Sequence, residues 1–207
     1  MAAVLIDGKA KKVYPASEEG VLIAEFKNDL TAFNRKKKSS TQNKGILNAQ
    51  ISEILFNYLS SHNIKNHFIS REENKLKIQK LAMIPVEVVV RNIATGSLSR
   101  NYDIPKGKIL AKPIVEYFLK NDDLDDPQMN EDHILAFELI RKEADIKELK
   151  EKALEVNSVL VNFFKASGLT LVDFKLEFGY LPSGEIILGD EMSPDNMRLW
   201  DSQTGNS

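Results

Sequence analysis

Residues 169–191, LTLVDFKLEFGYLPSGEIILGDE, decide the fold class because they predict a β-hairpin with an unusual charge pattern. Two apolar segments flank a Pro-Ser-Gly turn, which is typical of antiparallel strands. In the first segment Asp173, Lys175 and Glu177 alternate with apolar residues, so they share one face of the strand. Charges on one face of an otherwise apolar strand indicate a polar cleft. The alternative is the solvated face of an edge strand, stabilised by cross-strand ion pairs.

The end of this hairpin adds further acidic residues, because its second strand stops just before Asp190 and Glu191. Together with Asp173 and Glu177, these residues predict up to four carboxylates in a small volume. Carboxylates at that spacing need a divalent cation or a shared proton. The pattern offers only oxygen ligands, and the chain has no cysteine. Mg²⁺ or Mn²⁺ is therefore expected rather than zinc.

The N-terminal half predicts a small antiparallel sheet and one helix. Two strands around a turn are expected between residues 11 and 26, and residues 68–92 add three strand-like segments. The polar stretch 31–45, TAFNRKKKSSTQNKG, has no regular period and is expected to be a mobile loop. After it, apolar residues recur at helical spacing, which predicts a helix of about four turns, capped by Asn43 or Thr41.

The C-terminal half is predicted to hold the longest helix. Residues 94–132 are interpreted as mostly loops. Residues 144–166 carry apolar side chains at spacings of three and four and end at a Ser-Gly pair, which predicts an amphipathic helix facing the core. Residues 193–201, SPDNMRLWD, are expected to form a tail after the hairpin. The length of 207 residues allows one large domain or two packed lobes.

Two other segments carry candidate anion-binding residues. Gly8-Lys9-Ala10-Lys11 precedes a strand, where glycine allows close backbone approach and the lysines supply charge. A solvated turn is the alternative, and the segment matches neither GxxxxGK[ST] nor GxGxxG. Arg91 at a strand end and Ser97 in a glycine-containing turn form a candidate anion cradle, with Arg198 as a second clamp. Arg91 could equally pair with an acidic neighbour.

Composition and charge exclude several classes of protein. The formal net charge of -2 excludes a globally basic nucleic-acid binder, and the short run RKKK at 35–38 is interpreted as a solvated loop. The histidines at 62, 67 and 133 share no metal-ligand spacing and are expected at the surface. The N-terminus lacks the apolar run of a signal peptide, and no membrane span is predicted. The absence of cysteine indicates an intracellular or redox-indifferent protein, and a cytoplasmic location is expected.

Five segments occur in the order of one known family. They are GKAKKVY at 8–14, KGILN at 44–48, PVEVVVRNIATGSLSR at 85–100, LVDFKLEFG at 171–179 and GDEMSPDNMRLWD at 189–201. Together these segments resemble the family of phosphoribosylaminoimidazole-succinocarboxamide synthase, also called SAICAR synthetase. The resemblance extends over almost the whole chain.

The resemblance implies a two-lobed α+β fold with antiparallel sheets, related to the nucleotide-binding lobes of kinases and ATP-grasp enzymes. The expected domains are residues 1–83 on the ATP side and residues 84–207 around the second substrate and the metal. The implied reaction joins 4-carboxy-5-aminoimidazole ribonucleotide (CAIR) to L-aspartate, with ATP giving ADP and phosphate. ATP, CAIR and L-aspartate are the expected small-molecule partners, Mg²⁺ is the expected cofactor, and a second copy of the chain could form a homodimer. Neither nucleic acid nor membrane is expected as a partner.

The resemblance also implies roles for individual residues. These are Lys9 and Lys11 at the ATP phosphates, Lys80 and Met83 at the adenine, Glu177 and Asp190 on Mg²⁺, Arg91, Ser97 and Arg198 around CAIR, and Asp173, Lys175 and Lys120 as catalytic residues.

The expected chemistry is activation of the CAIR carboxylate as an acyl phosphate, followed by attack of the aspartate amine. Asp173 is a candidate general base if neighbouring carboxylates raise its pKa. Loops at 36–42 and 121–130 are expected to close over the site. The alternatives are a kinase-like phosphotransferase, although HRD-like and DFG motifs are missing from the sequence, and a non-catalytic nucleotide-binding module.

Overall fold

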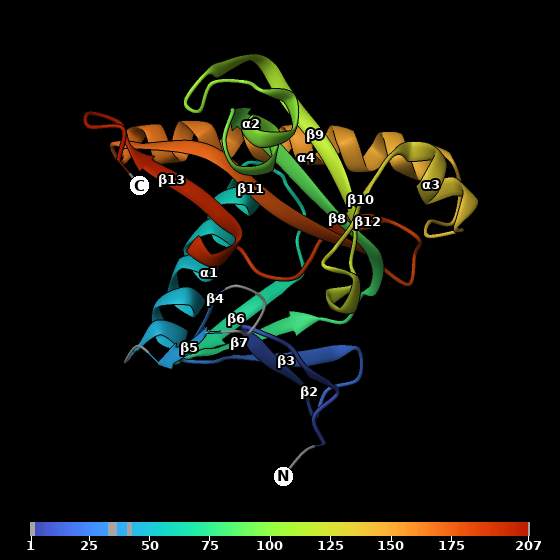
Figure 1. Cartoon of the computed structure of the whole chain (residues 1–207). Coiled ribbons are helices and arrows are strands. Elements are labelled where there is room, and N and C mark those ends of the chain that lie inside the picture. Colours follow the sequence, from blue (N-terminus) through green and yellow to red (C-terminus); the bar gives the residue numbers. More distant parts are fainter. Residues whose placement is uncertain (1–2, 33–36, 41–42, 207) are drawn as a thin grey trace.

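The computed structural model describes residues 3–32, 37–40 and 43–206, and the first of its sheets is antiparallel (Figure 1). The strand order in this sheet is β1-β2-β3-β7-β6. Its strands are β1 (Ile6–Asp7), β2 (Lys11–Pro15), β3 (Val21–Phe26), β6 (Phe68–Glu72) and β7 (Lys75–Gln79). The strands predicted between residues 11 and 26 and the first two segments of residues 68–92 are confirmed in this sheet. The third segment is β8 (Ala82–Ile93), which belongs to the second sheet instead. The first sheet and the helix that packs on it are called the first lobe.

The stretch expected to be a loop at 31–45 contains regular structure. β4 (Asp29–Ala32) and β5 (Lys37–Ser40) pair as an antiparallel hairpin, so the loop prediction is wrong for residues 31–32 and 37–40. It is also wrong for residues 44–45, which begin a helix. A hairpin held by backbone hydrogen bonds needs no side-chain period, which is why the pattern did not reveal it. Residues 35 and 36 of the basic run lie outside the described residues.

Helix α1 (Lys44–Ser61) packs its apolar side on the first sheet, and it begins differently from the prediction. Asn43 lies before the helix with a left-handed φ of 67°, and its side chain makes no capping hydrogen bond within the described part of the chain. Instead, Asn28 Oδ1 accepts a hydrogen bond from Gly45 N at 2.9 Å. A Cβ at Gly45 would lie 2.7 Å from the carbonyl oxygen of Phe26, so only glycine allows this close approach.

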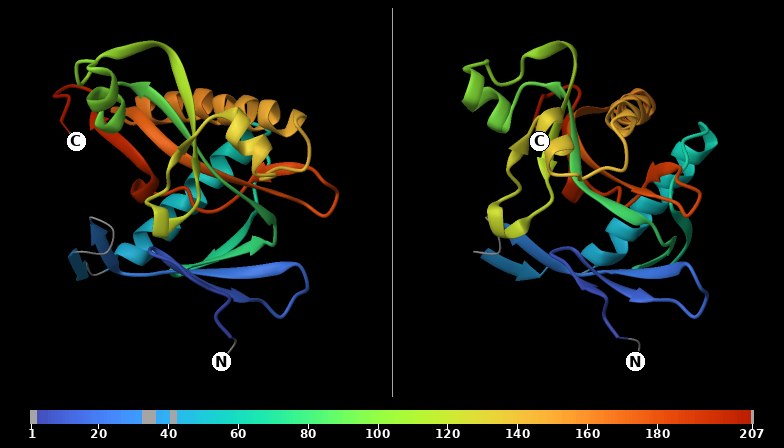
Figure 2. Two further views of the ribbon diagram at one scale, coloured as in Figure 1. Left: turned by 45° about the vertical axis from the view of Figure 1, so that its right-hand side comes forward. Right: turned by 90° about the vertical axis from the view of Figure 1, so that its right-hand side faces the viewer.

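The second sheet has the strand order β10-β9-β8-β11-β12, and β13 pairs with β11. Its strands are β8 (Ala82–Ile93), β9 (Ile109–Leu119), β10 (Gln128–Met129), β11 (Leu169–Tyr180), β12 (Ile186–Leu188) and β13 (Met197–Asp201). Helix α4 (Ala144–Ala166) lies along one face of this sheet, at the residues predicted for the longest helix (Figure 2). Short elements are α2 (Gly96–Tyr102), η1 (Asp122–Leu124), α3 (Glu131–Ala136) and η2 (Pro194–Asn196). The second sheet and these helices are called the second lobe.

Two predictions for the C-terminal half are wrong. Residues 94–132 hold α2, η1, β10 and the eleven-residue strand β9 rather than mostly loops. Pairing with β8 stabilises β9, from Val86 opposite Leu119 to Ile93 opposite Ile109, although the strand itself contains proline and charged residues. Residues 193–201 form η2 and β13 rather than a tail, because β13 pairs with β11 in the sheet.

The lobes are joined by backbone hydrogen bonds as well as by the chain. Residues 65–67 add to β12, where Asn66 forms a parallel bridge with Leu188 and His67 N donates to Leu188 O at 3.0 Å. The domain boundary predicted between residues 83 and 84 falls inside β8. The predicted α+β fold with antiparallel sheets is confirmed. Within the described ranges, no helix has the length and apolar character needed to cross a membrane.

Candidate active site

A pocket of about 720 Å³ is lined by residues of both lobes. One part of its lining is apolar and is formed by Val13, Leu22, Ile78, Leu81 and Met83. The rest is strongly charged and includes Lys9, Lys11, Lys44, Glu87, Lys120, Asp122, Lys175, Glu177, Asp190, Glu191 and Asp195. A cavity of this size with an apolar wall and a few converging polar groups is typical of a small-molecule site.

The apolar wall depends on two glycines. A Cβ at Gly179 would lie 2.7 Å from Leu81 Cβ, and one at Gly189 would lie 3.2 Å from Met83 Cε. Glycine at both positions therefore lets the start of β8 pack closely against β11 and the end of β12. Met83, predicted to lie at the adenine, lines this wall, whereas Lys80 is not among the described residues that line the pocket.

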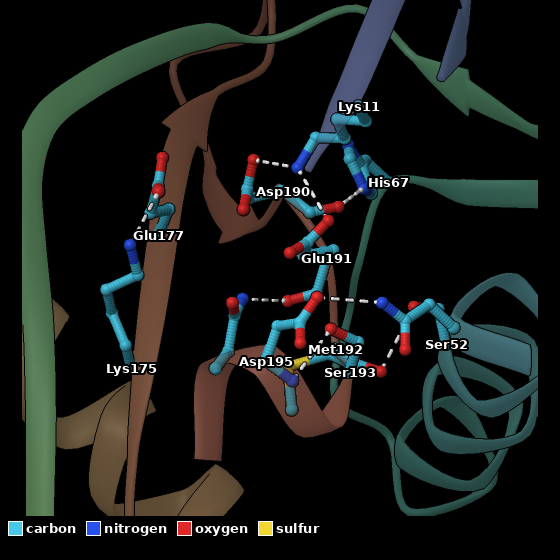
Figure 3. A network of polar contacts seen from close by, with 12 residues as sticks. Lys11, Ser52, His67, Lys175, Glu177, Asp190, Glu191, Met192, Ser193 and Asp195 are labelled. Atoms are coloured by element: carbon cyan, nitrogen blue, oxygen red, sulfur yellow. Dashed lines mark hydrogen bonds and ion pairs between the residues drawn. The ribbon is translucent and has the colours of Figure 1, made fainter. Parts of the chain in front are cut away.

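Lys11 connects the first lobe to the acidic residues of the second. Its Nζ donates to Asp190 Oδ1 at 2.7 Å and to Glu191 Oε2 at 3.1 Å (Figure 3). Burial by itself would lower the pKa of Lys11, but the two carboxylates outweigh burial and raise it. Burial would likewise raise the pKa of Asp190, but Lys11 and then Lys120 hold it below its ordinary value. Lys11 and Asp190 are therefore both charged at neutral pH.

Glu177 on β11 lies between two lysines. Its Oε2 accepts a hydrogen bond from Lys120 Nζ, and its Oε1 lies 3.7 Å from Lys175 Nζ. Lys175 Nζ also donates to Glu87 Oε1 at 2.5 Å. Burial, and then the charge of Asp190, raise the pKa of Glu177 to about 7 despite these lysines. Glu177 and Asp190 therefore repel each other across the pocket, which a bound cation would relieve.

Lysines pair with the carboxylates of the pocket, so the ion pairs of the alternative interpretation are present beside the candidate metal ligands. No group of three or more His, Cys, Asp and Glu side chains in the described ranges is arranged to hold a metal by itself. A metal at Glu177 and Asp190 would therefore need further oxygen ligands from a bound molecule. Mg²⁺ commonly binds in this way, through one or two carboxylates together with phosphates and water.

His67 contradicts the expectation that the histidines lie at the surface. Its side chain is buried beside Phe56, and its Nε2 lies 2.8 Å from the carbonyl oxygen of Asp190. Burial lowers the pKa of His67 to about 4, so the ring is neutral at physiological pH. Histidines 62 and 133 are exposed, as expected.

A second charged cluster is centred on Asp173 of β11. Arg198 donates from Nε to Asp173 Oδ1 at 2.7 Å and from Nη2 to Asp173 Oδ2 at 2.6 Å. Arg91 donates to Asp173 Oδ2 at 3.2 Å, to Ser97 Oγ at 3.0 Å and to Glu116 Oε2 at 2.5 Å. The structure thus brings Arg91, Ser97 and Arg198 together, as predicted. It also shows the acidic pairing of Arg91 that was the alternative.

Asp173 stands apart from the other charged residues of its strand. It is not among the described lining residues of the pocket, whereas Lys175 and Glu177 are. The hypothesis that Asp173 is a general base required neighbouring carboxylates, but guanidinium groups bind both of its oxygens. This geometry favours a role in holding Arg91 and Arg198 in place.

Sequence reasoning missed several acidic residues of the site, among them Glu87, Asp122 and Asp195. Glu87 was recognisable, because the alternation in PVEVVVR places it on the same strand face as Arg91. Asp195 could not be recognised from its own segment, because its partners are far away in the sequence. Its Oδ2 accepts hydrogen bonds from Lys44 Nζ at 2.6 Å and Asn48 Nδ2 at 2.9 Å, both in the first lobe.

A pocket between two lobes, with an apolar wall and with lysines and carboxylates along the rest of its lining, is typical of enzymes that act on nucleotide phosphates. The family model described as SAICAR synthetase matches residues 4–207. The chain therefore belongs to the SAICAR synthetase family, which confirms the resemblance.

Curated relatives and solved structures agree with this assignment. The phosphoribosylaminoimidazole-succinocarboxamide synthase of Thermococcus sibiricus is 52% identical over 204 residues, covering 98% of this chain and 86% of the relative. That of Halalkalibacterium halodurans is 48% identical over 203 residues, covering 98% and 85%. A solved SAICAR synthetase in complex with ADP has a TM-score of 0.93 at 47% identity, covering 98% of this chain and 86% of that one. The enzyme from Ehrlichia chaffeensis has a TM-score of 0.94 at 39% identity, covering 99% and 87%.

Proposed function

We propose that the chain condenses CAIR with L-aspartate to form SAICAR, while ATP is converted to ADP and phosphate. The observation that carries this proposal is the family match over residues 4–207. The nucleotide-sized pocket and the ADP complex of a relative support it. The enzyme is an ATP-dependent ligase of purine biosynthesis.

The nucleotide is proposed to bind with its adenine on the apolar wall and its phosphates at the lysines. Leu81 and Met83 offer a flat apolar surface at the start of β8, and Lys9 and Lys11 lie at the charged part of the pocket. A contact between Lys80 and the adenine stays a prediction, because Gln79 and Leu81 line the pocket and Lys80 does not. A polyphosphate would draw Lys11 away from Asp190, which would leave that carboxylate available for a cation.

The residues fit a Mg²⁺ ion at Glu177 and Asp190. Both supply carboxylate oxygens, Glu177 is buried and Asp190 is half-buried at the pocket, and burial, followed by the charge of Asp190, raises the pKa of Glu177 to about 7. When bound, Mg²⁺ would neutralise charge on the phosphates during transfer. Lys120 and Lys175 flank Glu177 and would keep its carboxylate in place while supplying positive charge of their own.

CAIR is proposed to bind towards the cluster of Arg91, Ser97 and Arg198. The two guanidinium groups and the Ser97 hydroxyl would donate hydrogen bonds to a phosphate or carboxylate group, and Asp173 orients both arginines from one side. The strand β11 carries Asp173 at one end of this arrangement and Glu177 at the other. A substrate lying along β11 would therefore have one end at the arginines and the other near the nucleotide phosphates.

The proposed chemistry follows from the leaving group. A carboxylate does not react with an amine at neutral pH, because an oxide ion would have to leave. Transfer of the γ-phosphoryl group to the CAIR carboxylate replaces that oxide by phosphate, and Lys11, Lys120 and Lys175 can stabilise the negative charge. The aspartate ammonium first loses a proton, and the free amine then attacks the acyl carbon. The new carbon–nitrogen bond forms as the bond to phosphate breaks, and the nitrogen gives up a second proton to solvent or to the leaving phosphate.

Omitting each substrate in turn tests the function. The purified chain should form SAICAR only with ATP, CAIR and L-aspartate together. A phosphotransferase would release ADP without aspartate and produce a stable phosphorylated product, and a binding module would bind ATP without turnover. The family match disfavours both alternatives.

The acyl-phosphate step has its own test. CAIR made with heavy oxygen in its carboxylate should give phosphate that carries one labelled oxygen per turnover, detected by mass spectrometry. Unlabelled phosphate with normal SAICAR formation would show that ATP activates another group.

A cytoplasmic location and a homodimer remain predictions. Size-exclusion chromatography with light scattering tests the homodimer.

A further inference from the structure

Asp190 has a backbone conformation that needs support. Its φ is 59°, in the left-handed region, which Asp adopts more readily than most residues with a side chain but which is still uncommon. It follows Gly189 just after β12, and its carboxylate is one of the two proposed Mg²⁺ ligands. Because the direction of a side chain follows from the backbone angles, this left-handed turn determines where the carboxylate points.

His67 contacts this turn from the first lobe. Its Nε2 lies 2.8 Å from the carbonyl oxygen of Asp190, and its side chain is 3% exposed (Figure 3). A carbonyl oxygen can only accept, so Nε2 carries the hydrogen and donates. The backbone of His67 is also fixed, because its N donates to Leu188 O at 3.0 Å and its O accepts from Gln79 N at 2.7 Å. The imidazole packs edge-on against Phe56, with ring centroids 5.4 Å apart.

The carboxylate of Asp190 has a different kind of contact. It accepts a hydrogen bond from Lys11, which also donates to Glu191. In the proposed function Lys11 turns to the nucleotide phosphates and Asp190 to the metal, so this contact changes when substrates bind. The bond from His67 to the carbonyl can persist through that change, because it involves neither the carboxylate nor Lys11.

We propose that His67 is a positioning residue of the metal site. Its hydrogen bond to the carbonyl of Asp190 maintains the left-handed turn that directs the carboxylate toward the metal of the bound nucleotide. The inference rests on the proposed function for the identity of the site. Loss of a group that orients a metal ligand typically weakens metal binding by about 10- to 100-fold. Removal of this hydrogen bond should therefore weaken metal binding by at least about tenfold.

Two variants and one control separate positioning from packing. His67→Phe keeps an aromatic ring beside Phe56 but removes the donor. His67→Gln keeps an N–H donor close to the position of Nε2. His62→Phe makes the same change as the first variant at an exposed histidine that ends α1. Mn²⁺ binding to the ADP-bound enzyme, followed by electron paramagnetic resonance, measures metal affinity directly, and calorimetry with ADP and EDTA measures nucleotide binding without metal.

The expected result is weaker Mn²⁺ binding in His67→Phe, with metal-free ADP binding and the KM for CAIR unchanged. His67→Gln should recover most of the affinity, and His62→Phe should match the wild type. Unchanged Mn²⁺ affinity in folded His67→Phe would overturn the inference, as would an equal loss in His67→Gln.

If His67→Phe fails to fold, His67→Asn replaces it, because the shorter asparagine side chain cannot reach the carbonyl of Asp190. Equal Mn²⁺ affinities in His67→Asn and His67→Gln would then overturn the inference. If the wild type makes no SAICAR, the proposed function fails, while the Mn²⁺ measurements still decide the role of His67.

Discussion

Lys9 Nζ lies 2.7 Å from Asp122 Oδ1, so the glycine turn of the first lobe is tied to η1 of the second. Both residues line the pocket. Since Lys9 is also proposed to bind the ATP phosphates, a nucleotide competes with Asp122 for the same ammonium group. The side chains are 31% and 54% exposed, so their attraction is weak and sensitive to salt.

Asp122→Asn should bind ADP more tightly than the wild type, because the amide competes less well for Lys9. Exposed ion pairs are worth up to about 1 kcal/mol, so the gain should be about two- to fivefold. Calorimetry at low salt measures it, and the gain should shrink at high salt. Asp123→Asn is the matched control. Weaker ADP binding in Asp122→Asn would show that this ion pair helps to close the site instead.

Glu177→Gln should retain the fold and lose turnover. The amide is isosteric but is a poorer ligand for Mg²⁺ and leaves Lys120 without its carboxylate partner. Loss of one charge-stabilising group commonly costs about 3 kcal/mol, so kcat should fall by two orders of magnitude or more. Steady-state rates across a Mg²⁺ titration check this, with the exposed Glu185→Gln as control. Wild-type rates at low Mg²⁺ would remove Glu177 from the metal site.

Arg91→Lys should weaken CAIR binding and leave ATP binding almost unchanged. A lysine cannot reproduce the fork that contacts Asp173 and Ser97 at once, although it keeps the charge. The KM for CAIR should rise about tenfold or more, since a lost charged hydrogen bond costs about 1.5–3 kcal/mol. Arg100→Lys, on the exposed side of α2, controls for the exchange itself. An equal rise in the KM for ATP would mark Arg91 as a structural residue.

Tyr117→Phe should stabilise the enzyme. The Tyr117 hydroxyl is buried and has no hydrogen-bond partner among the described residues, so its removal should add about 1 kcal/mol at neutral pH. Burial, and then the charge of Glu131, raise the pKa of Tyr117 to about 12. An unfolded tyrosine ionises near pH 10, so the wild type loses stability as pH rises from about 10 to 12. The advantage of Tyr117→Phe should therefore grow over that interval.

Urea unfolding at neutral pH and at about pH 11 measures both effects, with Tyr102→Phe at an exposed site as control. A variant less stable than the wild type would mean that the Tyr117 hydroxyl has a partner in solution.

Local pattern was sufficient where an element buries one face along its whole length. The spacing of apolar residues in α4 follows from such a face, and the predicted helix was confirmed. Strand β11 is largely buried on both faces, and its alternating charges mark the polar face, where Lys175 and Glu177 line the pocket and Asp173 binds the arginines. The glycine turn, the arginines and the acidic hairpin were also recognisable, because each combines a glycine or a strand end with neighbouring charged residues.

Contacts between distant segments could not be predicted in the same way. β9 depends on β8 for its conformation, and the burial of His67 depends on Asp190, 123 residues further along the chain. The role predicted for Asp173 was wrong for the same reason. Arginines rather than carboxylates face Asp173, and only the folded chain shows which groups lie there. Periodicity reports which face of an element is buried, not which residue lies opposite.

The backbone bridge between residues 65–67 and β12 has a consequence for how the chain can be divided. β12 pairs with β11 on one side and with Asn66 on the other, so the two lobes share a strand. A fragment ending at residue 83 would leave residues 65–67 without their partner, and the complementary fragment would expose the edge of β12. The lobes are therefore not independent folding units. Expressing one lobe alone, or exchanging it between proteins, would remove the strand pairing that both lobes share.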